Sequence, residues 1–123
     1  MMSAQICQVE LELGREPQHP FGERGRLYHL YLPLKADGSL DAEALRGSRG
    51  CCRGKRLRAG DGPAEGRIVL GAEGGLVLEY DDAPLRQSVV RLNSGPLVVG
   101  ESVPIAEADG ERHEFQVISV RHA

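Results

Sequence analysis

The chain has 123 residues, a net charge of −3, and only two Phe, three Tyr and no Trp. This length fits one domain that buries roughly two thirds of the surface of its unfolded chain, so we expect a single domain over residues 1–123. The charge excludes a globally basic nucleic-acid coat, and the few aromatic residues limit base stacking.

The sequence contains no apolar run of about 18 residues and no basic N-terminus followed by an apolar segment. It therefore predicts a cytoplasmic protein without membrane association. The three cysteines are Cys7, Cys51 and Cys52. Their number is odd and the adjacent pair is poorly placed to bridge to itself, so we expect reduced thiols.

The first predicted element is a strand over Gln5–Leu13, in which apolar and polar residues alternate. Residues 14–25, GREPQHPFGERG, combine two Pro, three Gly and four charged residues and predict a long exposed loop. A second strand is predicted at 27–34. Pro33 cannot donate to a sheet ladder, which predicts an edge or a bulge at this end of the strand, and Pro104 makes the same prediction for the last hairpin.

One short helix is predicted near residues 41–46. Asp41 can cap its N-terminus, Leu40 and Leu45 have the spacing of a hydrophobic staple, and Gly47 can end it. At about one and a half turns it is too short to form an architectural layer.

Two hairpins are predicted at 67–80 and 99–120. In the second, a two-residue turn would mix apolar and polar residues on each face. A three-residue turn at 108–110, with Gly110 in the left-handed conformation, pairs Val103 with Phe115 and Ile105 with His113 and gathers one apolar face.

The requirement for a single apolar face also predicts a three-residue loop at 72–74 in the first hairpin, which pairs Leu70 with Leu76 and Ile68 with Leu78. A further strand is predicted at 85–92. The apolar alternation slips at 89–90 and at 117–118, as at bulges where a sheet bends. About seven or eight short strands and one helix predict an all-β fold, a small antiparallel barrel or sandwich.

Three segments carry a resemblance: RLYHLYLPLKADGSLDAEALR, CRGKRLRAGDG and GESVPIAEADGERHEFQVISV. Together they resemble a group of short bacterial proteins that share an L-Y-L-P-L-x-A-D-G-x-L-D segment, a Cys-Arg basic segment and a C-terminal G-E-x-V-x-I hairpin ending in F-x-V-x-S-V. The resemblance covers most of the chain after Arg26. The group has no assigned activity, so the resemblance implies no catalytic, cofactor or binding residue.

The basic segment 46–58 is the best candidate for a binding function, because clustered guanidinium groups bind phosphate and release counterions from nucleic acid. The candidate residues for nucleic acid or phosphate are Arg49, Arg53, Lys55, Arg56 and Arg58. Alternate side chains of a strand face opposite ways. Arg53, Lys55 and, if the strand extends that far, Arg49 therefore form one set, and Arg56 and Arg58 the other.

The sequence predicts no cofactor, no metal site and no defined catalytic residue, since no C-x-x-C, H-x-x-x-H, nucleophile or phosphate-loop motif occurs. Cations beside Cys51 and Cys52 favour the thiolate, but these residues follow the C-terminus of the helix, which opposes that effect. Two small packing residues are the favoured interpretation.

Three functional hypotheses follow. The favoured one is a non-enzymatic interaction module that pairs with itself or with a protein, through strands that carry Pro33 and Pro104. The second is a weak nucleic-acid or phosphate binder that uses the basic segment 46–58. The third is a small enzyme with a spatially assembled site around Cys51 or His113.

Overall fold

The structure is a computed structural model, and it describes residues 5–14, 23–47, 52–58, 60, 62–71, 75–81, 88–90, 96–107 and 110–122. Within these residues the chain forms eight strands and one short helix. In chain order the elements are β1 (Gln5–Leu13), β2 (Glu23–Leu34), α1 (Ala42–Gly47), β3 (Arg53–Arg58), β4 (Ala64–Leu70), β5 (Leu76–Tyr80), β6 (Ser88–Val90), β7 (Ser102–Ala106) and β8 (Arg112–His122).

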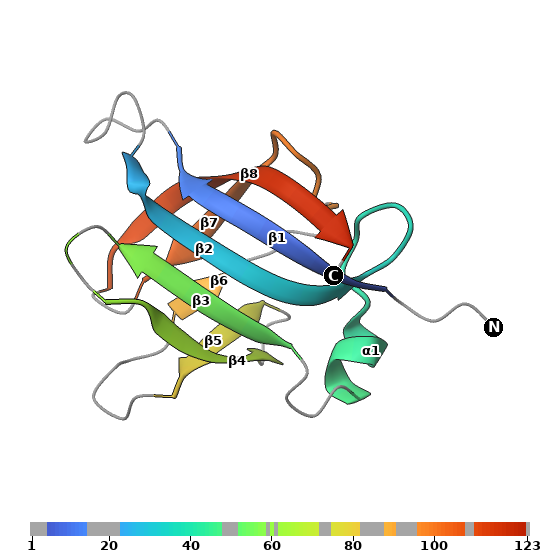
Figure 1. Ribbon diagram of the computed structural model, residues 1–123. Coiled ribbons are helices and arrows are strands. Elements are labelled where there is room, and N and C mark those ends of the chain that lie inside the picture. The colour runs from blue at the N-terminus through green and yellow to red at the C-terminus, as the bar shows by residue number, and fades with distance from the viewer. Residues whose placement is uncertain are drawn as a thin grey trace.

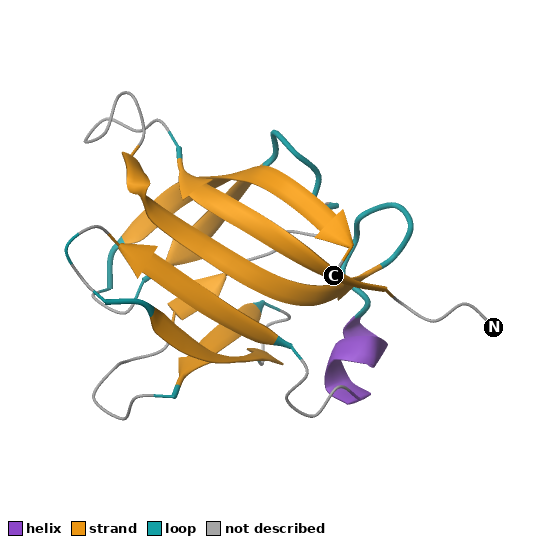
Figure 2. Cartoon of the chain, viewed as in Figure 1, coloured by secondary structure: helices purple, strands orange, loops and turns teal. Residues whose placement is uncertain are grey.

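The strands form a closed antiparallel barrel (Figures 1 and 2). Each strand pairs with the next one along the chain, and β8 returns to pair with β1, with Leu13 opposite Phe115 near one end and Cys7 opposite His122 at the other. The prediction of an all-β fold is confirmed. The β1–β8 pairing makes the fold a barrel and not a sandwich.

Both hairpin registers match the sequence prediction. Val103 lies opposite Phe115 and Ile105 opposite His113 in the β7–β8 hairpin. Gly110 has a φ of 87°, the left-handed conformation that glycine adopts without steric cost. In the β4–β5 hairpin, Leu70 faces Leu76 and Ile68 faces Leu78. The loop residues 72–74 and 108–109 lie outside the described residues.

The phase slip predicted at 117–118 is a bulge. Along β1, Glu10 pairs with Ser119 whereas Leu11 pairs with Val117, so Ile118 is the extra residue. A bulge bends its strand and strengthens the local twist, which helps a sheet to close. Of the strand predicted at 85–92, the structure describes Ser88–Val90 as β6, and it does not describe their side chains.

The helix has its predicted N-cap, and one loop prediction needs correction. The Asp41 carboxylate accepts a hydrogen bond from the Ala44 N–H at 3.1 Å, as an N-cap does. The loop predicted at 14–25 is too long, because β2 already begins at Glu23. Residues 15–22 of that loop lie outside the described part of the chain.

The two prolines do not mark open edge strands, because the sheet closes. Pro33 lies where the neighbouring strand β3 has stopped pairing. The β2–β3 pairing ends at Leu30, and beyond it the Pro33 carbonyl accepts a hydrogen bond from the Asp41 N–H. The described β6–β7 pairing ends at Ile105, one residue from Pro104. The missing N–H groups therefore cost no described ladder hydrogen bond.

Apolar side chains fill the barrel. The core includes Val9, Leu11, Leu13, Leu30, Leu32, Leu76, Leu78, Ile105, Phe115 and Val117. The rings of Tyr28 and Phe115 meet edge to face, with centroids 5.1 Å apart. Gly66 has no space for a side chain, since a Cβ there would overlap the backbone of Glu79 on the next strand. The described apolar side chains thus form a packed core.

The two ends of the barrel differ in chemistry. At the end where α1 lies, Leu45 of the helix and Leu97 join the apolar core (Figure 1). The opposite end, where β3 finishes and β8 begins, carries inward-facing polar residues. We call this group the polar mouth; it consists of Arg26, Tyr28, Arg56, Arg58, Glu107 and His113.

Candidate functional site

Strand alternation places these polar residues inside the barrel. In β2 the inward series of Tyr28 and Leu30 extends back to Arg26, which lies opposite Arg58 of β3. Gly54, two positions before Arg56 on β3, faces the core, because a Cβ there would meet side chains of Leu30, Ile68 and Leu78. Arg56 and Arg58 share this inward face, since side chains two apart on a strand point the same way.

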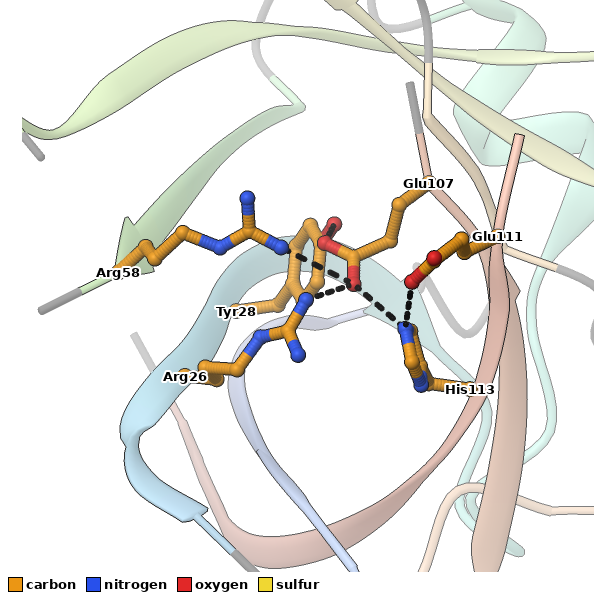
Figure 3. A network of polar contacts seen from close by, with 6 residues as sticks. All are labelled: Arg26, Tyr28, Arg58, Glu107, Glu111 and His113. Carbon is orange, nitrogen blue, oxygen red and sulfur yellow. Dashed lines mark hydrogen bonds and ion pairs between the residues drawn. The ribbon is translucent and has the colours of Figure 1, made fainter. Parts of the chain in front are cut away.

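Glu107 is the centre of the polar mouth (Figure 3), and its side chain is only 4% exposed. Its Oε1 accepts a hydrogen bond from Nη2 of Arg26 at 2.9 Å, and its Oε2 accepts one from the Tyr28 hydroxyl at 2.9 Å. A buried carboxylate needs such partners, because an unpaired buried charge is expensive. The backbone of Glu107 starts the turn, with its N–H donating to the Glu111 carbonyl at 2.7 Å.

His113 lies between two carboxylates (Figure 3). Its Nε2 is 3.2 Å from Oε2 of Glu111 and 3.9 Å from Oε1 of Glu107. The imidazole is buried, whereas the Glu111 side chain is 64% exposed and forms the rim. The predicted position of His113 opposite Ile105 is confirmed, and its polar neighbours are an addition that the register alone does not give.

Among the described residues, Arg58 and Arg56 are less strongly ion-paired than Arg26. Nη2 of Arg58 is 3.9 Å from Oε1 of Glu107, which is an ion pair but too long for a hydrogen bond, and its side chain is 29% exposed. The Arg56 guanidinium lies over the Tyr80 ring, 5.5 Å from the centroid. Among the described residues, no carboxylate forms an ion pair with Arg56, and its buried Nε has no hydrogen-bond partner.

The polar mouth therefore carries an excess of positive charge. Among the described residues, its inner face carries three guanidinium groups, those of Arg26, Arg56 and Arg58, and one buried carboxylate, that of Glu107. Glu111 at the rim is mostly in water, where its charge is screened. Guanidinium groups in a partly dry site attract anions more strongly than the same groups on an open surface.

On the outer face of β3, in contrast, the cations are paired with carboxylates. Arg53 pairs with Asp81, and Nζ of Lys55 lies 3.1 Å from Oε1 of Glu65. The two cations on this face thus have carboxylate partners, Glu65 on β4 and Asp81 directly after β5. The predicted division of the basic segment into two faces is confirmed for Arg53, Lys55, Arg56 and Arg58. Arg49 lies outside the described residues.

The two described cysteines, Cys7 and Cys52, are not at the polar mouth. Cys52 is buried just before β3 begins, at the far end of that strand from Arg58, and Cys51 is outside the described residues. Cys7 is buried in the core as predicted, and its Sγ is 3.9 Å from Nδ1 of His122. The described Cys–His contact therefore joins residues that the enzyme hypothesis did not name, at the opposite end of the barrel from His113.

Two further observations apply to the described residues alone. They contain no cluster of three or more His, Cys, Asp or Glu side chains placed to hold a metal ion. None of their helices has the length and apolar character needed to cross a bilayer. Comparisons with protein-family models, with curated proteins and with solved structures each returned no match.

Three residues of the polar mouth were not singled out from the sequence: Arg26, Tyr28 as a polar partner, and Glu107. The signal was present in the alternation. The inward-facing series of Val103 and Ile105 continues to Glu107 two residues later. The inward-facing series that contains Tyr28 begins two residues earlier, at Arg26. A guanidinium and a carboxylate at the ends of two inward-facing series would have predicted a charged layer inside the barrel end.

Proposed function

We propose that the protein binds a small anionic ligand at the polar mouth of its barrel. The observation that carries the proposal is the charge on the inner face: three guanidinium groups and one carboxylate among the described residues, with Arg56 outside any ion pair there. Charge-assisted hydrogen bonds from guanidinium groups are among the strongest contacts that a protein offers to phosphate or carboxylate.

This proposal refines the binding hypothesis drawn from the basic segment 46–58. It keeps Arg56 and Arg58, adds Arg26, and leaves out Arg53 and Lys55, whose charges are matched on the outer face. A long nucleic acid would need an extended basic surface, which these two outer cations do not supply. The interaction-module hypothesis remains a prediction, and the closed sheet removes the open edge strands on which it was based.

Binding is tested by isothermal titration calorimetry with inorganic phosphate at low ionic strength, because salt screens the attraction. We expect saturable binding that is weakened at least about tenfold by Arg58→Gln, the loss of one charge-assisted contact. Arg53→Gln is the matched control, since it removes the same charge from the outer face of the same strand. No binding by the wild-type protein, or equal weakening by both variants, would refute the proposal.

A further inference from the structure

We propose that the bound group is a dianionic tetrahedral oxyanion, a phosphoryl or sulfuryl group, and that the polar mouth discriminates against carboxylates. This inference rests on the proposed function and narrows its ligand class. It depends on the spacing of Arg56 and Arg58, on the hydrogen bonds already made by Glu107, and on the net charge of the site.

The spacing of the two arginines suits a group with more than two oxygens. Arg56 and Arg58 lie on one face of β3, with Cα atoms roughly 7 Å apart for residues separated by two positions on a strand. A carboxylate has two oxygens, which one guanidinium fork satisfies. A tetrahedral oxyanion has further oxygens on other sides and can therefore accept hydrogen bonds from both forks at once.

The site presents donors to such a group. Both oxygens of Glu107 already accept a hydrogen bond, one from Arg26 and one from Tyr28. Arg58 lies 3.9 Å from that carboxylate, so its N–H groups are not used up by it. A fully deprotonated oxyanion needs only donors, and the available guanidinium groups supply them.

The net charge of the site also favours a dianion. Arg26 and Arg58 share the single carboxylate of Glu107, and Arg56 forms no ion pair among the described residues, so two of the three positive charges are not offset there. A dianion would neutralise both, whereas a monocarboxylate would leave one guanidinium without a counter-charge in a partly buried position.

The depth of the polar mouth limits which part of the ligand can enter it. Tyr28 and Phe115 pack edge to face directly inside Glu107, and apolar side chains fill the barrel beyond them. The ligand therefore enters no deeper than its charged group. Either an inorganic ion or the terminal group of an ester meets this requirement, and both share the same oxyanion chemistry.

The test compares the affinities of sodium sulfate, methyl phosphate, inorganic phosphate and sodium acetate for the full chain, by calorimetry at matched ionic strength. We expect sulfate and methyl phosphate to bind at least about tenfold more tightly than acetate, the effect of one additional charge-assisted hydrogen bond. Arg56→Gln should bring the sulfate-to-acetate ratio close to one. Arg53→Gln should leave the ratio as in the wild-type protein.

The outcomes separate the inference from the proposed function. Equal affinities for sulfate and acetate would overturn the inference and leave anion binding intact, whereas no binding of any of the four anions would overturn both. A ratio that is unchanged in Arg56→Gln would also overturn the inference. Tighter binding of methyl phosphate than of inorganic phosphate identifies an ester as the ligand. Tighter binding of inorganic phosphate identifies the inorganic ion. Either result supports the inference.

Discussion

Replacing Glu107 by Gln leaves the Arg26 guanidinium buried beside an uncharged amide. The side chains of Glu107 and Arg26 are 4% and 10% exposed and 2.9 Å apart. Water therefore does little to stabilise the Arg26 charge once the carboxylate is removed. Removing one partner of a buried ion pair typically costs 3–5 kcal/mol. We expect a loss of about 3 kcal/mol in the free energy of unfolding, at the low end because the amide oxygen can still accept the Tyr28 hydrogen bond.

A double-mutant cycle separates this charge interaction from other effects of the substitution. Glu107→Gln and Arg26→Met are measured singly and together by urea unfolding. The chain has no Trp, so unfolding is followed by far-UV circular dichroism, with tyrosine fluorescence as a second probe. The double variant should lose about 2 kcal/mol less than the sum of the two single losses, as for residues in direct contact.

The outer face of the barrel provides the matched control. Nε of Arg67 and Oε1 of Glu79 are 2.8 Å apart, nearly the same distance, but their side chains are 63% and 30% exposed. The coupling in the cycle Arg67→Met and Glu79→Gln should stay below about 1 kcal/mol. Additive losses in the inner cycle, within about 0.5 kcal/mol, or equal coupling in both cycles would refute the role assigned to burial.

Two further predictions concern the barrel wall and one exposed turn. Gly66→Ala should destabilise the fold by about 3 kcal/mol, because the new Cβ would overlap the Glu79 backbone. Gly62→Ala is the control and should change the urea midpoint little, because the space around Gly62 is open. Similar urea midpoints for the two variants would contradict the close packing of β4 on β5. Hydrogen bonds from the Ser39 hydroxyl and N–H to Oδ1 of Asp37 hold the pKa of that carboxyl below its usual value. The contribution of these hydrogen bonds to stability is present at neutral pH and disappears as the pH falls through the lowered pKa. In a carboxyl-detected NMR titration, Ser39→Ala should raise the pKa of Asp37. An unchanged pKa would contradict the role of Ser39.

The local parts of the fold could be predicted from the sequence because they depend on short-range patterns. Alternation defined β1 to the residue, and the requirement for one apolar face fixed the register of both hairpins. Barrel closure could not be predicted in the same way. It depends on pairing between β1 and β8, whose partners Cys7 and His122 are more than a hundred residues apart, and no local pattern encodes such a contact.

The candidate site could be predicted only in part. Strand alternation separated Arg56 and Arg58 from Arg53 and Lys55, but it did not say which set faces inward. That choice depends on Gly54, which permits close packing against Leu30 and Leu78 and so turns the arginines that follow it on the same face into the barrel. The pairing of Arg26 with Glu107 joins two residues 81 positions apart and required the closed barrel.

Locating a bound anion in a crystal tests the central claim most directly. Selenate is a tetrahedral dianion whose selenium gives an anomalous diffraction signal, so crystals grown with selenate would show its position without reference to a ligand model. We expect an anomalous peak inside the polar mouth, within hydrogen-bond distance of both Arg56 and Arg58. Peaks confined to the outer face around Arg53 and Lys55, with none in the polar mouth, would contradict it.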